Sequence, residues 1–360
     1  MSGGLVNLVS KGIQDSYLIS GTPDSSLFRM RYTRHSNFAQ VPYKISDLII
    51  PENSTKVIEI PSKGDILTYM WFEGVDMFSQ FRGCRLELRI GGQIVDRQSS
   101  TFLTDVWPVY MPDSYTKASV INNSTSSSNK TFQPLHFFFN DNWQHIPLVA
   151  LQYHKVEIVI TTTGNAINAK MYGNFVFVDT KERTALVEGP KQFIITQVQE
   201  FFTDAVDGEV ASIDLSHLNH PVRSIFWGAS ANSSDMSRDY WTFSEADLYL
   251  NGTPYFENMS PTYFHSVQGY YCTPTGMINM DPITNTPFFT RFYTYNFCMN
   301  SSSYKPTGSC NFSRMDNAKL VIKGLSRGSN HAAGGGIHVI AVNYNVLKIE
   351  RGLGGVLFSN

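Results

Sequence analysis

The sequence predicts an all-β protein made of two antiparallel sandwiches in tandem. Short alternating apolar runs, bounded by Gly, Pro and Asn turns, recur along the chain, and long helical patterns are nearly absent. A charged, apolar-poor stretch over residues 178–190 divides the chain near its middle and ends in Gly189-Pro190, a pair that breaks helix and strand. Three patterns of the first half recur in the second. Face-to-face packing of two sheets hides strand edges, and the jelly roll is one common way to achieve it.

The composition fits a globular protein with covered surfaces. A chain of 360 residues can hold two domains, each with its own core. Charged residues make up 16% of the chain, against roughly 25% in a typical soluble protein, and aromatic residues make up 13%. This balance is typical of surfaces that bind partners, and equally of a β protein rich in Asn, Ser and Thr. A net charge of −2 argues against a dedicated nucleic-acid-binding protein.

The cysteines and the N-terminus indicate an intracellular, soluble protein. None of the four cysteines, Cys84, Cys272, Cys298 and Cys310, lies in a zinc-site spacing, and such scattered thiols are typical of reduced proteins. Polar residues interrupt the apolar N-terminal run, so we expect no signal peptide. No run approaches the roughly 18 apolar residues of a membrane span. We therefore expect synthesis in the cytosol.

The first 20 residues predict a short amphipathic helix. Leu5, Val9, Ile13 and Tyr17 recur every four residues and would form one apolar stripe. Gly12 weakens this helix, so we expect it to be marginal until the stripe packs against something.

Strand patterns follow along the first half. Arg29 to Tyr32 alternates as in a strand and Arg34-His35 extends its basic side, which favours a solvated strand face over a site for an anionic partner. Residues 56–60, 67–72 and 150–160 also read as strands. Residues 122–129 form a polar, low-complexity loop that we expect to be exposed. Its sequons make Asn122, Asn123 and Asn129 candidate glycosylation sites.

The repeat between the halves depends on three anchors. Residues 85–90 meet Gly91-Gly92 and residues 246–250 meet Asn251-Gly252, so each half predicts a hairpin with a primed turn. In this alignment Leu86 and Leu88 match Leu248 and Leu250. Thr101-Phe102 matches Tyr263-Phe264, and residues 155–158 match residues 319–322. Three anchors in the same order, offset by roughly 160 residues, indicate tandem duplication.

No pattern of catalytic or metal-binding residues accompanies these strands. The sequence has no Gly-x-Ser-x-Gly elbow, and its glycine clusters at 334–336 and 352–355 fit neither a P-loop nor a dinucleotide fingerprint. His217 and His220 flank Asn219 and precede Pro221, which favours a turn over a metal site. We expect neither enzymatic activity nor a cofactor or metal ion.

Residues 27–38 end in the basic stretch Tyr32-Thr33-Arg34-His35-Ser36-Asn37-Phe38. This segment resembles the major capsid proteins of nucleocytoplasmic large DNA viruses, including those of chloroviruses and mimiviruses, where the family has a Y-x-R-H-[ST]-N-F signature. The other similar segments lie in the same order along the chain, at residues 3–18, 86–93, 147–154, 306–318 and 343–360.

The resemblance implies two consecutive eight-stranded antiparallel jelly rolls. The first would span residues 21–180 and the second residues 191–360, with a linker at 181–190 and a helical segment at 1–20. It implies a homotrimer that presents six rolls as a pseudo-hexagonal capsomer, tiling an icosahedral capsid over an internal membrane. The virion would be assembled in the host cytoplasm. Residues 1–20 would lie on the inward side, where the apolar stripe could contact neighbouring capsomers or minor capsid proteins. No direct contact with nucleic acid is implied.

Two departures from the family leave alternatives open. Many relatives carry larger insertions between strands, and the linker keeps Glu182-Arg183 without the Arg-rich run often found there. The chain could therefore be the principal shell protein or a minor capsid paralogue. A competing class is a glycan-binding or attachment protein with tandem sandwiches, whose site would include exposed aromatic residues such as Tyr270-Tyr271.

Overall fold

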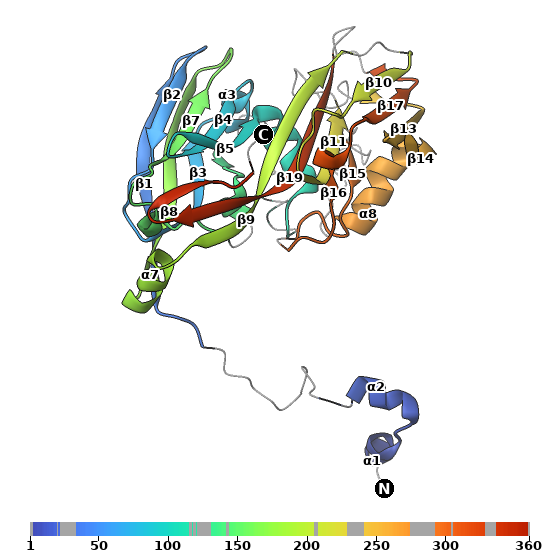
Figure 1. Ribbon diagram of the computed structural model, residues 1–360, viewed down its shortest axis with the longest axis horizontal. Helices are drawn as coiled ribbons and strands as arrows, with labels where there is room; N and C mark the ends of the chain where they lie inside the picture. Colours follow the sequence, from blue (N-terminus) through green and yellow to red (C-terminus); the bar gives the residue numbers. More distant parts are fainter. Residues whose placement is uncertain are drawn as a thin grey trace. The chain divides into compact units, whose positions relative to one another are not determined.

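The chain forms two compact units, residues 1–37 and residues 38–360. The computed structural model describes residues 3–19, 21, 34–114, 117, 120, 131–141, 144–204, 208–228, 241–273, 292–303, 305–327 and 336–358. The larger unit contains all the described strands, and Figure 1 shows the strands of its two halves side by side, with β9 and β19 running between them.

The N-terminal unit is helical, but the expected single helix is wrong. Helix α1 spans Gly3–Val9, a 3₁₀ turn η1 spans Ile13–Asp15, and α2 spans Ser16–Ile19. Gly12 is extended, and its N–H donates to the Asp15 carboxylate at 2.6 Å, which begins a new turn instead of continuing α1. Glycine inside a helix is destabilising by roughly 0.5–1 kcal/mol relative to alanine, which favours this break. None of the residues in these three short elements is buried.

The first half of the larger unit contains two antiparallel four-stranded sheets. One has the order β1-β8-β3-β6 and the other the order β2-β7-β4-β5. The strands are β1 (Phe38–Ile50), β2 (Thr55–Glu59), β3 (Ile66–Gly74), β4 (Arg85–Ile90), β5 (Gln93–Ser99), β6 (Phe132–Pro134), β7 (Val156–Thr161) and β8 (Ile167–Val178).

The second half repeats both pairing orders. Strands β9, β19, β11 and β15 pair in the order of β1, β8, β3 and β6, and the sheet β10-β17-β13-β14 matches β2-β7-β4-β5. These strands are β9 (Lys191–Thr203), β10 (Ala211–Asp214), β11 (Pro221–Gly228), β13 (Glu245–Leu250), β14 (Thr253–Met259), β15 (Phe292–Asn296), β17 (Ala318–Lys323) and β19 (Ile337–Glu350). Short strands are added at β12 (Trp241–Thr242), β16 (Cys310–Asn311), β18 (Ser326–Arg327) and β20 (Leu353–Val356). The double jelly roll is therefore confirmed.

The two hairpins are confirmed, with their turn chemistry. Gly91 and Gly92 have φ of 58° and 82°, and Asn251 and Gly252 have φ of 50° and 77°. Such values define the primed turn whose twist matches that of the flanking strands.

The residue pairing proposed between the halves needs correction. The ladders place Leu88 opposite Ile158 and Leu248 opposite Leu320, so Leu88, not Leu86, corresponds to Leu248. The anchor strands likewise match with Val156 at the position of Ala318. Alternation alone could not fix the register, because a two-residue shift leaves every side chain on the same face.

Short helical elements connect the strands. In chain order they are α3 (Met77–Phe81), η2 (Phe102–Val106), α4 (Trp107–Tyr110), α6 (Phe138–Asp141), η4 (Leu148–Ala150), α7 (Thr180–Val187), η6 (Tyr263–Val267), α8 (Gln268–Cys272) and η7 (Phe312–Arg314). The run expected as a strand over 150–160 is extended only from Val156. Arg34 and His35 lie in no regular element, and Arg29 to Tyr32 lie outside the described residues.

The predicted linker contains helix α7, which the sequence pattern did not indicate. Asp179 caps it by accepting a hydrogen bond from the Thr180 N–H at 2.7 Å, and the chain leaves it before Gly189, whose φ is 73°. Arg183 of this helix donates from Nε and Nη2 to the two carboxylate oxygens of Asp65, at 2.9 Å each. A bidentate ion pair therefore ties α7 to the first half.

Candidate assembly surfaces

One face of the sheet β1-β8-β3-β6 is open and aromatic. Tyr69, Trp71 and Tyr172, which we call the first outer face, point away from the core, and Tyr69 is 44% exposed. The Trp71 ring lies 5.3 Å from that of Tyr172, stacked, and 5.8 Å from that of Tyr69. Alternate residues of β3, Met70 and Phe72, are buried in the core. Large, partly exposed aromatic rings are enriched at protein interfaces.

The equivalent face in the second half is buried. Ile225 and Trp227 of β11 pack in the core of the second half, while Phe226, between them, packs in a cluster made mainly of first-half residues. Ile340 and Val342 of β19 share that cluster. We call Phe226, Ile340 and Val342 the second outer face. Because both faces of this sheet are covered, β11 is an almost uninterrupted buried run.

The cover is a helical arm of the first half, residues 102–111, which comprises η2, α4 and the following residue. The Tyr110 ring lies 5.4 Å from that of Phe226, and its hydroxyl donates to the Phe292 carbonyl. Burial raises the pKa of the Tyr110 phenol, so it stays a neutral donor. The Ser302 hydroxyl donates to the Pro112 carbonyl at 3.0 Å, which fixes the end of this first arm.

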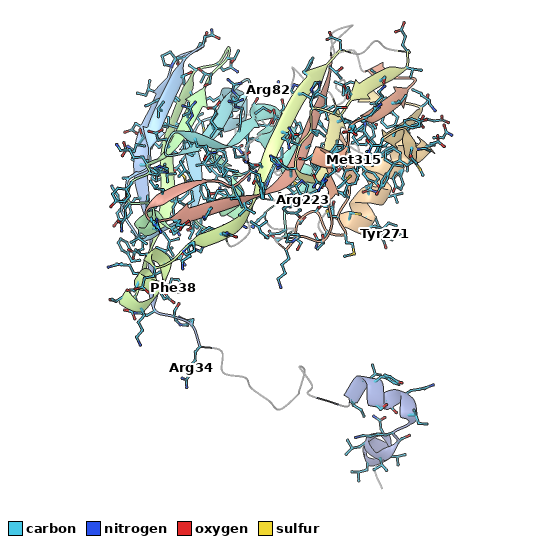
Figure 2. All side chains as sticks on the ribbon, viewed as in Figure 1. Arg34, Phe38, Arg82, Arg223, Tyr271 and Met315 are labelled. Carbon is cyan, nitrogen blue, oxygen red and sulfur yellow. The ribbon has the colours of Figure 1, made fainter. Side chains whose placement is uncertain are left out.

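The second half has an equivalent arm, which among the described residues does not cover the outer face of a sheet. Residues 263–272 form a π-helix, η6, that runs into α8, as η2 runs into α4. Tyr270 and Tyr271 of this second arm are 81% and 74% exposed. Figure 2 shows Tyr271 at the surface of the second half, whereas the labelled Arg223 lies inside.

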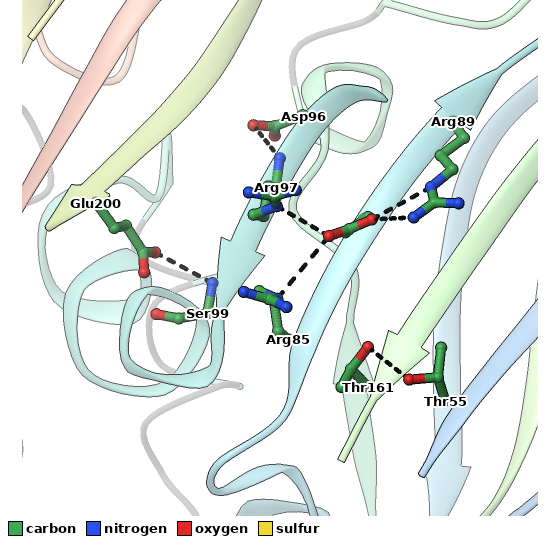
Figure 3. A network of polar contacts seen from close by, with 9 residues as sticks. Thr55, Arg85, Arg89, Asp96, Arg97, Ser99, Thr161 and Glu200 are labelled. Atoms are coloured by element: carbon green, nitrogen blue, oxygen red, sulfur yellow. Dashed lines mark hydrogen bonds and ion pairs between the residues drawn. The ribbon is translucent and has the colours of Figure 1, made fainter. Parts of the chain in front are cut away.

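Polar contacts between β5 and β9 complete the joint between the halves. The Val198 N–H donates to Asp96 Oδ1 at 2.8 Å. The Ser99 N–H donates to Glu200 Oε1 at 3.1 Å (Figure 3). Each carboxylate thus accepts a hydrogen bond from a backbone N–H group of the other half. The two bonds satisfy donors on the edge strands β5 and β9. Burial raises the pKa of Asp96 to about 7 and also raises the pKa of Glu200.

A buried carboxylate marks the same position in both hairpin sheets. Glu87 accepts from Arg89 Nη2 at 2.6 Å and from Arg97 Nε at 2.9 Å, in the network of Figure 3. Burial alone would raise the pKa of Glu87, but the hydrogen bond from Arg89 and both positive charges outweigh it and lower the pKa. Asp247, at the equivalent ladder position, is paired with Lys323 at 2.8 Å. Both serve the fold, since their oxygens face partners of their own sheet.

The predicted site residues fall into three groups. Leu5, Val9, Ile13 and Tyr17 are all exposed, from 51% to 87%, in the N-terminal unit. The candidate glycosylation residues Asn122, Asn123 and Asn129 lie outside the described residues. Tyr270-Tyr271, named for a glycan site, is exposed on the second arm. The first outer face was not predicted, although the alternation of Tyr69 and Trp71 with apolar residues could have indicated it.

Metal clusters and membrane spans are both absent from the described part of the chain. It contains no group of three or more His, Cys, Asp or Glu side chains placed to hold a metal ion. None of its helices has the length and apolarity required to cross a membrane. His220, one of the two histidines expected in a turn, has a φ of 66°.

Comparisons with known proteins agree with this architecture. A sequence family described as "Major capsid protein N-terminus" matches residues 26–179, and "Large eukaryotic DNA virus major capsid protein" matches residues 182–355. The major capsid protein of Pyramimonas orientalis virus is 29% identical and that of Paramecium bursaria Chlorella virus 1 is 26% identical, each over the full length of both chains.

Solved structures show the same fold. The chain in the quasi-atomic PBCV-1 virus capsid superposes with a TM-score of 0.77 at 22% identity, covering 93% of this chain and all of that one. The Faustovirus major capsid protein has a TM-score of 0.68 at 11% identity and covers 94% of each chain. The fold and the two family matches together define a double jelly-roll capsid protein. The chain belongs to the major capsid protein family of large eukaryotic DNA viruses, a family of structural proteins of the virion capsid.

Proposed function

We propose that three copies of this chain form a capsomer that presents six rolls as a pseudo-hexagon and tiles an icosahedral shell. The observation that carries this is the repeated strand order of the two halves. Because each chain contains two similar rolls, an assembly of three chains presents six similar side surfaces to its neighbours. Weak contacts repeated by symmetry then stabilise the shell without strong pairwise affinity.

The division of the chain supports this role. We propose residues 21–180 as the first roll, 181–190 as a fixed joint and 191–360 as the second roll. The Arg183–Asp65 ion pair anchors the joint to the first half, and the cluster that holds Phe226 spans both halves. A rigid pair of rolls keeps the angle between neighbouring walls constant, which a closed ring requires.

The N-terminal segment is proposed as the inward-facing contact. Leu5, Val9, Ile13 and Tyr17 are exposed apolar residues, and such groupings mark interaction sites. Their partners would be neighbouring capsomers or minor capsid proteins, close to the internal membrane and without direct contact with nucleic acid. Assembly would take place in the host cytoplasm.

The mass of the purified protein in solution tests the trimer. We expect light scattering to give about three times the chain mass of 40.5 kDa at micromolar concentration, the range of moderate protein affinities. A monomer throughout that range would contradict the proposal.

Removal of residues 1–20 tests the N-terminal role. None of the described residues of this segment is buried, so the truncated chain should keep its circular dichroism spectrum and form trimers, but assemble poorly into larger particles. Particle yield equal to that of the full chain would refute the inward contact.

The copy number per virion, from electron microscopy, separates a principal shell protein from a minor capsid paralogue.

A further inference from the structure

Among the described residues, the internal repeat leaves one arm and one sheet face without an equivalent partner. The first arm covers the second outer face, whereas the second arm ends in exposed Tyr270 and Tyr271 and the first outer face carries partly exposed aromatic rings. Each unused element is the duplicate of an element that is used. The contact inside the chain therefore shows the geometry that a contact between two chains would have.

The two outer faces correspond residue by residue. The ladder between β3 and β8 shifts register between Leu67 and Tyr69, and the ladder between β11 and β19 shifts between Val222 and Ser224. Counting from these matched bulges places Trp71, opposite Tyr172, at the position of Phe226, opposite Ile340. On the neighbouring strands, Phe132 occupies the position of Phe292.

The two arms also correspond. Thr101 immediately precedes the π-helix of the first arm, and Thr262 immediately precedes that of the second. Counting from these two threonines places Tyr271 at the position of Tyr110 and Tyr270 at that of Val109. Tyr110 is only 6% exposed because the second outer face surrounds it, while Tyr271 is 74% exposed. The same residue type at the same position thus has a partner in one arm and solvent in the other.

We propose that the second arm of one copy packs on the first outer face of another copy. Tyr271 would lie against Trp71 and reach the backbone at Phe132, as Tyr110 lies against Phe226 and reaches the carbonyl of Phe292 inside the chain. The partner is a second copy of this chain, because the geometry of the contact is already realised between its own halves.

The chemistry of both surfaces suits such a contact. Tyr and Trp offer large apolar area with few rotatable bonds, and they tolerate water before assembly because of their polar atoms. Lys44 and Glu73 are exposed on the same sheet face as Tyr172 and Trp71, giving the charged rim around an apolar centre that is typical of interfaces.

The contact is head-to-tail, so it closes into a ring only at the right rotation. Each copy offers one arm and one face, which makes the interface heterologous. This inference rests on the proposed trimer: if each step between rolls repeats the step inside the chain, three copies close the ring of six rolls. To the proposed trimer, the inference adds the residues through which the copies make contact.

Substitutions on each side test the contact. Tyr271→Ala and Trp71→Ala are each expected to raise the dissociation constant of the trimer by about 30-fold or more, as for a central aromatic residue of an interface. Tyr153→Ala is the matched control, since Tyr153 is 73% exposed on neither surface, and should leave the constant unchanged. Sedimentation velocity over a concentration series measures all three, with circular dichroism to verify folding. Tyr69→Ala replaces Trp71→Ala if the latter does not fold.

A mixing experiment tests the direction of the contact. The Trp71→Ala chain keeps its arm and the Tyr271→Ala chain keeps its face, so an equimolar mixture should give a one-to-one heterodimer that neither variant forms alone. A contact of arm with arm, or of face with face, would give no such complementation and would overturn the proposal.

The outcomes separate this inference from the proposed trimer. Trimeric wild type with unaffected Tyr271→Ala and Trp71→Ala variants would overturn the contact and leave the trimer standing. A monomeric wild type would overturn both. Loss of glycan binding, with trimers intact, on substitution of Tyr271 would assign the second arm to an attachment site and overturn the contact.

Discussion

The outer faces of the two equivalent sheets differ in what covers them. In the second half, Phe226 is fully buried beneath the first arm, whereas in the first half Tyr69 and Trp71 meet solvent. Strand order, the bulge and the arm are the same in both halves. The difference therefore comes from the connectivity of the chain. Two rolls in one chain make one contact between an arm and an outer face. Among the described residues, the other arm and the other outer face have no equivalent partner.

Side-chain choice follows this difference. The covered face carries Phe226, Ile340 and Val342, which have no polar atom to hydrate. The open face carries Tyr69, Trp71 and Tyr172, whose polar atoms can meet water before assembly. A permanently buried face and a face buried on association thus use different kinds of apolar residue at matching positions.

The largest expected effect comes from truncating the matched aromatic residues. Phe226→Ala should lower the free energy of unfolding by about 3–5 kcal/mol, because it leaves a cavity in a packed joint. Trp71→Ala should cost about 1–2 kcal/mol in the isolated chain, since its ring is only partly buried. Urea denaturation in the Tyr271→Ala background measures both without a contribution from assembly.

Equal costs at the two positions would contradict the comparison. They would mean either that the first arm does not seal the joint or that the first outer face is covered within the same chain. Val57→Ala is a suitable control, since Val57 is 54% exposed on the other sheet of the first half and should change stability by less than about 0.5 kcal/mol.

A smaller effect is expected from pH, and it should be specific to the joint. Asp96 faces β9, whereas the equivalent ladder position in the second half holds Phe256. Burial raises the pKa of Asp96 from 3.8 to about 7. The folded chain then binds the proton more tightly than the unfolded chain. Stability should therefore fall as the pH rises from about 4 to about 7, by up to about 1.4 kcal/mol for each pH step of one.

Asp96→Asn removes this titration and should flatten the pH dependence of unfolding over that interval. Burial also raises the pKa of Glu200, so a residual slope should remain until that residue is replaced as well. Arg85 and Arg97 are the nearby cations on the first half. Identical pH profiles for Asp96→Asn and wild type would show that the Asp96 carboxyl remains ionised in the joint.

The sequence predicted the architecture because turns and alternation are local signals. Gly91-Gly92 and Asn251-Gly252 dictate their turns, and the strands on each side alternate visibly. The repeat follows from these signals, but its register was wrong by two residues at Leu86, since alternation is blind to such a shift. Helix α7 was not predicted because it buries no residue and so has no apolar stripe to detect.

The assembly surfaces were harder to predict because they depend on which face is covered. Nothing in the run around Phe226 says that its outer side meets the first arm, some 115 residues earlier in sequence by a rough count. Tyr271 stood out as an exposed aromatic residue, but its likeness to Tyr110 appears only when the two π-helices are aligned from their first residues. Long-range packing, not local propensity, decides both.

The smallest expected effect concerns the hairpin turn, a feature that both halves share. Gly92 and Gly252 occupy the same turn position with φ of 82° and 77°, and an added Cβ would meet nothing within 4 Å at either site. Gly92→Ala and Gly252→Ala should therefore each cost about 1 kcal/mol, solely from the left-handed backbone conformation. Thermal or urea denaturation compares them. Gly91→Ala should cost more, because its Cβ would lie 2.3 Å from His154 Nδ1. That nitrogen lies 2.8 Å from the carbonyl oxygen and 3.1 Å from the backbone nitrogen of Gly354 in the second half. Unequal costs for Gly92 and Gly252 would show that the two hairpins, despite identical turns, differ in how freely they can relax.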